Sequence, residues 1–350
     1  MSPLPIFDGH NDTLLRLYRK GLPVSAFFER SGEGHLDLPR ARAGGFAGGL
    51  FACFVPSDGP DDDVPVAERS GYAVPFPRTP GREKALAVVN ALAARLQRIA
   101  RASEGEVVIC RTAAEIRTGI DQGNFAAVLH IEGAEAIDPD LEALEVLHAA
   151  GLRSLGQVWS RPNIFGHGVP FRFPSSPDTG GGLTDAGKAM IRACNELRIV
   201  IDLSHLNEAG FWDVAAISTA PLVATHSNAH ALCAASRNLT DKQLDAIRDS
   251  GGVVGLNLAV SFLRPDGRND ADTPLDVVCD HVDHLVGRLG EDGVALGSDF
   301  DGCTVPAAIG DAAGLQRLID ALRARGYGEA ELRKFAHENW LRVLKQTWGG

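Results

Sequence analysis

Short apolar stretches alternate with longer helical patterns along almost the whole chain, and this rhythm limits the fold more than any other feature. Eight such stretches can be counted, at residues 5–9, 48–55, 126–132, 152–159, 199–205, 222–226, 253–258 and 294–299. Near-continuous apolar strands that are separated by helices are typical of a parallel sheet covered on both faces. Eight of them favour the α/β class and a closed (β/α)8 barrel of the TIM type over an open sheet.

Patterns with a helical period fill the spaces between these stretches. They predict helices at residues 82–102, 112–121, 139–150, 184–197, 207–217, 240–250, 276–289, 314–325 and 329–346. Thr184-Asp185 and Thr240-Asp241 are typical helix starts. We expect a single barrel domain over residues 1–350, with long loops near 56–81 and 161–182, and loops of that length are usually functional or disordered.

Composition excludes several classes of protein. Lys and Arg number 34 against 45 Asp and Glu, a formal charge of −11, which argues against a nucleic-acid partner. No apolar run approaches the roughly 18 residues that span a bilayer. The first residues do not resemble a signal peptide, so we expect a cytoplasmic protein without a membrane partner. The six cysteines form no CxxC pair, which makes a disulfide framework or a cysteine zinc site improbable.

The ends of the predicted strands carry the residues with chemical potential. In barrels of this kind the active site lies at the carboxyl ends of the strands, and five of the eight ends carry a histidine or a carboxylate. These residues are His10, Asp12, Glu132, His205, His226 and Asp299. Imidazole nitrogens and carboxylate oxygens are ordinary zinc ligands, and this set can fill two metal sites that share one bridging carboxylate.

Each of these residues alone has a plainer interpretation, as a strand-end turn, a helix cap or a hydrogen-bonded core histidine. His130 shares the face of Glu132, and we expect it to pack in the interior beside the metal ligands. The pair His281 and His284 is expected on a solvated helix face. The remaining aromatic side chains of helical segments are expected in the core, namely Trp212, Trp340 and Trp348.

Six short motifs give the chain a family resemblance. They are FDGHND at 7–12, IEG at 131–133, IDLSH at 201–205, THS at 225–227, SRN at 236–238 and GSDFDG at 297–302. With these motifs in this order, the sequence resembles the renal (membrane) dipeptidases, the M19 metallopeptidases, among the metal-dependent amidohydrolase-like barrels. The resemblance extends from residue 7 to residue 302.

The resemblance implies a zinc-dependent enzyme that hydrolyses small dipeptides. His10 and Asp12 would hold one Zn²⁺, His205 and His226 would hold a second, and Glu132 would bridge the two. Other divalent metals also bind such ligand sets. Two ions that share a water lower its pKa, so that a hydroxide is present at neutral pH to attack the peptide carbonyl.

The resemblance also implies roles beyond the metal ligands. Asp299 would take the proton of the attacking water and, with Glu132, form the catalytic pair. Arg237 would bind the terminal carboxylate of the dipeptide, for which its forked guanidinium suits better than lysine. Mammalian members have a histidine at the end of strand four, where this chain has Trp159. Some bacterial-looking relatives share the pattern WxRxN, so we expect a subgroup in which Trp159 and Asn163 contact the substrate.

Other interpretations stay open at this level. His167, on the long loop, could replace the missing histidine, although an exposed loop histidine is the simpler reading. A related amidase, lactonase or deaminase could use the same barrel and ligands. A non-catalytic metal-binding barrel is a third reading, but it would not need Asp299. The dipeptide, its stereochemistry and the oligomeric state are not determined by the sequence, and a homodimer is one of the states considered.

Overall fold

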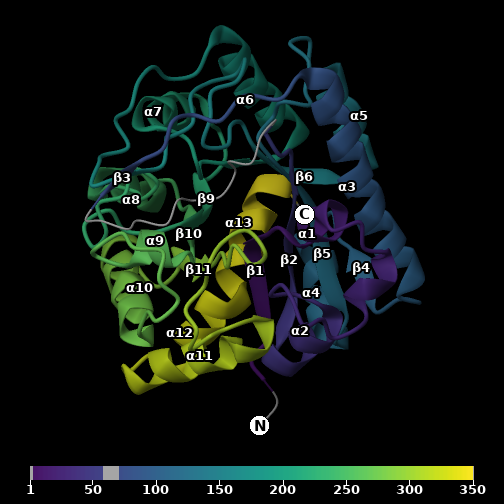
Figure 1. The fold of residues 1–350 in the computed structure, drawn as a ribbon, viewed down its shortest axis with the longest axis vertical. Helices are drawn as coiled ribbons and strands as arrows, with labels where there is room; N and C mark the ends of the chain where they lie inside the picture. The colour runs from purple at the N-terminus through teal and green to yellow at the C-terminus, as the bar shows by residue number, and fades with distance from the viewer. Residues whose placement is uncertain (1–2, 58–70, 350) are drawn as a thin grey trace.

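The computed structural model describes residues 3–57 and 71–349, and a parallel sheet lies at its centre (Figure 1). Its strands pair in the order β1-β2-β5-β6-β8-β9-β10-β11. All seven pairings along this path are parallel. The strands are β1 (Ile6–Asn11), β2 (Phe46–Phe54), β5 (Phe125–Glu132), β6 (Leu152–Gly156), β8 (Val200–Asp202), β9 (Val223–Ser227), β10 (Val253–Leu256) and β11 (Val294–Leu296).

The two ends of this strand order meet, which makes the sheet a nearly closed barrel. Asn11 at the end of β1 forms a parallel bridge with Phe300, just beyond β11. The amide of Asp12 donates to the carbonyl of Phe300 at 2.8 Å, and the amide of Asp299 donates to the carbonyl of His10 at 3.0 Å. The predicted fold class, a (β/α)8 barrel, is confirmed.

The alternation along β5 shows how the sequence fills the barrel. Ala126 and Val128 belong to the cluster inside the sheet, whereas Phe125 and Ala127 belong to the layer between sheet and helices. Because alternate side chains of a strand face the same side, the same pattern carries polar residues inward near the end of β5. β5 therefore places apolar side chains in the barrel interior near its amino end and polar side chains there near its carboxyl end.

The helices surround the barrel, and α13 closes its amino end, in the centre of Figure 1. Trp340 is fully buried, and its indole N–H donates to the carbonyl of Leu296 at 2.9 Å. The helices are α1 (Thr13–Arg19), α2 (Leu38–Gly44), α3 (Arg82–Ala102), α4 (Ala113–Gln122), α5 (Glu142–Ala150), α6 (Asp185–Leu197), α7 (Glu208–Ile217), α8 (Asp241–Asp249), α9 (Val260–Leu263), α10 (Leu275–Leu289), α11 (Leu315–Ala324), α12 (Glu329–Arg333) and α13 (Asn339–Trp348).

Most predicted helices are confirmed, and the differences have local causes. α6 and α8 begin where expected, with Thr184 and Thr240 as their N-caps. The last predicted helix is divided by a π-helical segment at Lys334–Glu338. Not predicted were α1, α2, α9 and the three-residue strand β4 (Val107–Ile109), which pairs with the first half of β5. These elements have only three to seven residues each.

Two predictions about side chains are wrong. Trp212 is not in the core: its side chain is 39% exposed, because the buried face of α7 passes through Phe211 and Val214. His281 is not on a solvated face: it is 1% exposed, because it lies on the inward stripe of α10 with Val278 and Leu285. Trp340 and Trp348 are buried as expected.

The two predicted long loops touch each other in their described parts. Residues 58–70 of the first loop lie outside the described residues. Beyond them, β3 (Tyr72–Ala73) pairs antiparallel with β7 (Arg172–Phe173) of the second loop. Within residues 3–57 and 71–349, no helix combines the length and the apolar character needed to cross a membrane. The six cysteines are all unpaired, and five of them are buried.

Candidate metal centre

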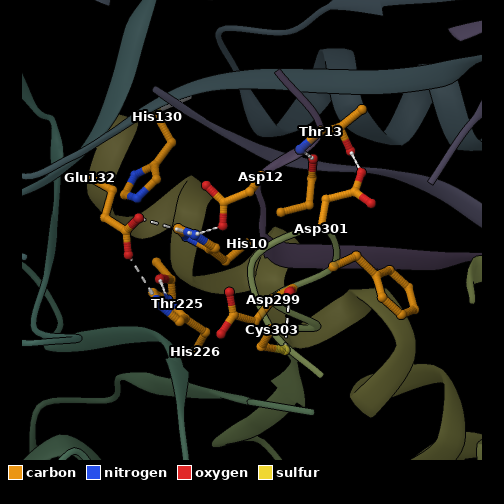
Figure 2. Close-up of polar contacts among 12 residues, drawn as sticks. His10, Asp12, Thr13, His130, Glu132, Thr225, His226, Asp299, Asp301 and Cys303 are labelled. Carbon is orange, nitrogen blue, oxygen red and sulfur yellow. Dashed lines mark hydrogen bonds and ion pairs between the residues drawn. The ribbon is translucent and has the colours of Figure 1, made fainter. Parts of the chain in front are cut away.

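The predicted ligands gather inside the carboxyl end of the barrel, where the strand ends converge. Figure 2 shows His10 between two carboxylates. Its Nε2 lies 3.5 Å from Asp12 Oδ2 and 3.7 Å from Glu132 Oε2. All three side chains are at least 94% buried. One oxygen of Glu132 is thus directed at the pair from the first strand.

The other oxygen of Glu132 faces the remaining histidines. His205 Nε2 lies 3.0 Å from Glu132 Oε1, and His226 Nε2 lies 3.4 Å from the same oxygen. The two Nε2 atoms are 3.1 Å apart. Glu132 therefore stands between two ligand pairs that come from opposite parts of the sequence, as a bridging carboxylate would.

Asp299, which lies three residues beyond the end of β11, completes the cluster. One of its carboxylate oxygens lies within 4.8 Å of a possible ligand atom of His10 and of one of Asp12. Asn257, which follows β10, donates from Nδ2 to Asp299 Oδ2 at 3.0 Å. Gly302 allows this approach, since a Cβ there would lie 2.2 Å from Asp12 Oδ2 and 2.6 Å from Asp299 Oδ1.

The backbone is strained at the same place. His205 and Asp299 have φ values of +65° and +57°, and Asp301 has +69°. Non-glycine residues adopt this left-handed region uncommonly, and such residues are often found at functional sites. The other three in the described residues, Glu104, Leu141 and Arg198, lie at or next to the ends of helices. The fold therefore accepts unfavourable backbone geometry to aim two of the predicted site residues inward.

Hydroxyl groups hold the imidazoles in place. Thr225 donates its hydroxyl to Asp202 Oδ2 at 2.6 Å, and His226 Nδ1 lies 2.8 Å from the same hydroxyl oxygen. With that proton committed to Asp202, the hydroxyl accepts from His226 Nδ1, and the lone pair of Nε2 faces Glu132. The hydroxyl of Ser160 contacts Nδ1 of His205 at 2.7 Å in the corresponding position. Partners on the far nitrogen are how proteins orient a metal-binding histidine.

The electrostatics of the cluster favour bound cations. Burial lowers the pKa of both His205 and His226 well below the usual value, so both imidazoles are neutral. Burial opposes protonation of His10 as well, but Glu132, Asp12 and Asp299 together raise its pKa to about 10. The three carboxylates thus create a site that binds positive charge, and neutral imidazoles beside it supply nitrogen ligands.

The residues present fit a divalent metal. Both ring nitrogens of His10 and Asp12 Oδ1 are buried without a hydrogen-bond partner. Buried polar atoms of this kind are normally satisfied, and those that are not call for a ligand or an ion. Three groups of possible ligands include His10, of which one joins Glu132 and His226 and another joins Asp12 and Asp299. A third includes His130, which contacts Ser154 through Nδ1.

A cavity of about 100 Å³ opens beside the cluster. Asp12, Glu132, His205 and Asp299 form its polar side. Most of the other lining residues are aromatic or aliphatic. They are Leu15, Arg19, Phe54, Trp159, Phe171, Phe262, Asp301, Gly302 and Cys303. Trp159 thus lines the cavity, with its ring centroid 5.8 Å from that of His205.

The other predicted substrate residues lie differently. Arg237 is 4% exposed and lies behind the cavity wall, with its guanidinium carbon 6.0 Å from the ring centroid of Phe262. It donates to Ser227 Oγ and to the carbonyl of His226, both at 2.8 Å. Asn163 does not line the cavity, since its amide donates to the Gln157 carbonyl at 2.7 Å and stabilises its own loop. His167 is exposed and away from the cavity lining.

Several residues of the site were not singled out from the sequence. Asn257 directly follows β10, and a search of the strand ends for amide as well as charged side chains would have found it. Phe54 ends the second strand, yet an aromatic residue there is indistinguishable from core. Phe171 comes from the long loop before β7 and Phe262 from the four-residue helix α9, and the sequence does not reveal the path of either segment.

Comparison with known proteins agrees with this geometry. The sequence profile of the membrane dipeptidases, peptidase family M19, matches residues 1–348. The chain belongs to peptidase family M19. It is thus a metallo-dipeptidase by family, a hydrolase of peptide bonds, and the family implies a divalent metal for the cluster around Glu132.

Solved structures of similar proteins support this placement of the M19 chain. A metallopeptidase from Rhodobacter sphaeroides, solved with a phosphinate mimic of the dipeptide L-Ala-D-Ala, is 52% identical, with a TM-score of 0.94 over 99% of this chain and 100% of that one. The metallopeptidase described as dipeptidase AC is 53% identical, with a TM-score of 0.95 over the full length of both chains. The uncharacterized protein in the pqqA 5′ region of Klebsiella pneumoniae is 54% identical over 253 residues, which are 72% of this chain and 93% of that relative.

Proposed function

We propose that this M19 peptidase hydrolyses small dipeptides at a pair of zinc ions. His10 and Asp12 would hold one ion, His205 and His226 would hold the other, and Glu132 would contribute to both sites. The observation that carries this proposal is the position of Glu132, whose two oxygens face the two ligand pairs at 3.0–3.7 Å. When bound, the ions would supply a hydroxide at neutral pH and positive charge for the developing oxyanion.

The proposed reaction also needs a side chain that transfers the proton of the attacking water. Asp299 is buried beside the ligands, and burial, opposed by His10, raises its pKa to about 6. Bound cations would lower this pKa, and a buried carboxylate beside them can accept a proton from water and return it. Asn257, bonded to Oδ2 of Asp299, holds the carboxylate in one orientation. We assign to Asp299 the transfer of the proton from water to the leaving amine.

The cavity indicates the size and charge of the substrate. Its volume of about 100 Å³ suits small side chains, and aromatic rings enclose it on one side. The Nε–H of Arg237 is a buried donor with no partner among the described residues. We assign to it the terminal carboxylate of the dipeptide, reached past Phe262. The ligand of the Rhodobacter relative mimics L-Ala-D-Ala, so dipeptides with a small D-residue in second position belong among the proposed substrates.

A dipeptide panel with metal quantified on the same sample tests the proposal. It should contain L,L and L,D pairs with small and large side chains, each also with an amidated terminus. We expect about two zinc ions per chain and preferential cleavage of small dipeptides with a free carboxylate. Equal cleavage of amidated substrates would favour a general amidase, and stoichiometric metal without turnover on any substrate would favour a binding protein.

A further inference from the structure

Arg161 is fully buried beside the cavity without lining it. Each of its three nitrogens donates to a different partner. Nε donates to Glu135 Oε1 at 2.9 Å, Nη1 to Ser57 Oγ at 2.6 Å, and Nη2 to the carbonyl of Val55 at 2.6 Å. Its partners follow β2 and β5, whereas Arg161 itself follows β6. One side chain thus ties together the ends of three neighbouring strands.

The guanidinium also supports the aromatic wall of the cavity. Its central carbon lies 5.2 Å from the ring centroid of Phe54 and 5.3 Å from that of Trp159. The two rings are 4.9 Å apart and both line the cavity. A desolvated cation over an aromatic face is a favourable contact. The planar fork, bonded in three directions, therefore lies in contact with both rings.

A buried ion pair is a poor way to gain stability, because its desolvation offsets most of the attraction. An apolar side chain would fill the same space without that penalty. In some proteins buried ionic groups are retained because they specify one geometry. Here the specified geometry is that of the cavity, since Phe54 and Trp159 are the side chains that Arg161 touches on the cavity side.

We propose that Arg161, paired with Glu135, is a positioning residue that fixes Phe54 and Trp159 as a rigid wall and thereby limits the size of the dipeptide side chain that the cavity accepts. The inference rests on the proposed dipeptidase function. Lysine cannot replace arginine here, because a single ammonium does not offer a rigid planar fork.

The experiment compares Arg161→Lys with wild type on a series of dipeptides in which one side chain grows from alanine to leucine to phenylalanine. With full metal content, we expect KM for the alanine substrate to rise roughly tenfold while kcat changes little, since loss of shape complementarity is worth about this much. The ratio of kcat/KM for phenylalanine over alanine substrates should rise by a similar factor. An unchanged ratio in the metal-loaded variant would overturn the proposal.

A matched control separates positioning from general stability. Arg342 in α13 donates to the carbonyls of Gly251, Gly252 and Asp292 at the amino end of the barrel. Arg342→Lys should lower the melting temperature and leave the substrate profile unchanged. If it shifts the profile as Arg161→Lys does, the effect of Arg161 is one of stability, and the proposal is wrong.

A second variant keeps the test decisive if Arg161→Lys does not fold. Phe54→Leu removes part of the wall directly and should shift the profile toward large side chains. Glu135→Gln removes the charge partner of Arg161 and should shift it in the same direction, by less. No shift in Glu135→Gln together with a shift in Phe54→Leu would show that the wall stands without the ion pair. Absence of dipeptide cleavage by wild type would instead reject the proposed function.

Discussion

At the scale of single residues, the site is defined by how far each side chain is removed from water and what it faces. Glu132 shows this most clearly. Its carboxylate is 5% exposed and in contact with three imidazoles. Burial raises its pKa well above the usual value in the absence of bound cations. Cations bound at this position would restore the charged form, so we expect metal binding and the ionisation of Glu132 to be coupled.

Replacing Glu132 tests the bridging role. In Glu132→Gln one anionic oxygen is lost from both proposed sites, so affinity for both ions should fall by more than the roughly 10- to 100-fold typical of losing a supporting contact. Elemental analysis after dialysis against a weak chelator measures the effect. The exposed residue Glu145 provides the control, since Glu145→Gln should retain wild-type metal content. Full occupancy and normal turnover in Glu132→Gln would rule out the bridge.

Replacing Asp299 tests the proton transfer. Asp299→Asn preserves shape but not basicity, so kcat should fall roughly 100-fold or more while metal content stays near that of wild type. Steady-state kinetics and metal analysis on one preparation measure both quantities. Loss of metal in this variant would identify Asp299 as a ligand rather than a proton acceptor.

Replacing Arg237 tests carboxylate recognition. Removing one partner of a desolvated charged contact costs about 2–4 kcal/mol, or roughly 30- to 1000-fold in kcat/KM. Arg237→Ala should show this loss on a dipeptide and a much smaller one on its amidated form. Equal losses on both substrates would mean that Arg237 only supports the loop after β9 through Ser227 and His226.

At the scale of elements, loops are held to the barrel by buried polar side chains of the helices. His281 of α10 accepts from the amide of Ala229 at 3.2 Å through Nδ1, and its Nε2–H donates to the carbonyl of Leu263 at 2.9 Å. Accepting on one nitrogen and donating on the other requires a neutral ring. Burial accordingly lowers the pKa of His281 to about 4.

The stability of the protein should therefore depend on pH through His281. Between pH 6.5 and 4 the unfolded chain binds a proton at this residue and the folded protein does not, so the free energy of unfolding decreases as pH falls. The contribution approaches roughly 3 kcal/mol at pH 4. His281→Gln should remove it, and the difference between wild type and variant in denaturant unfolding from pH 7 to 4 isolates it. A difference that does not vary with pH would contradict the expected pKa.

Helices and strands were predictable from the sequence where apolar residues recur with a regular spacing or form a continuous run. The eight strands and α3 show this, and α3 has the predicted limits of 82–102. β4 has three residues and α9 has four, and neither was predicted. β8 and β11 are as short as β4, but each lies within a longer apolar run, at 199–205 and 294–299. The inward position of His281 was present in the spacing of Val278, Val282 and Leu285, but a polar residue on an apolar stripe is easily assigned to the wrong side.

The residues of the candidate site were likewise predictable only in part. Strand ends identify the candidate ligands, because every parallel strand of the barrel brings its last residues to the same end. Residues that follow longer loops were not accessible in this way. Asn163 is adjacent to the site in sequence, yet its amide is bound to its own loop, and nothing in the residue type reveals which partner it takes.

At the scale of the whole molecule, the seam between β1 and β11 joins the two ends of the barrel. Asp8 Oδ1 accepts from the amide of Ser298 at 2.6 Å, and Oδ2 accepts from its hydroxyl at 2.9 Å. His10 and Asp299 lie immediately beside this contact. The proposed metal centre therefore lies directly beside the contact that closes the barrel.

Removing the metal should weaken the whole fold. Ions bound only by the folded protein stabilise it by mass action, by roughly 4 kcal/mol when free metal exceeds its Kd 1,000-fold. Chelation should therefore lower the melting temperature by several degrees, and added zinc should restore it. In Glu132→Gln the same treatment should have little effect. Equal melting temperatures of wild type with and without chelator would show that the centre does not contribute to closure.

The seam also sets an order of events during synthesis. Asp8 and Ser298 are 290 positions apart, so His10 and Asp12 emerge from the ribosome long before Asp299 exists. Glu132, His205 and His226 follow in turn, and none of them is placed until the strand that carries it is paired. We therefore expect a nascent chain to offer only scattered, weak ligands, and tight capture of metal by the proposed ligands to be delayed until the final third of the polypeptide has been released and has met the first strand.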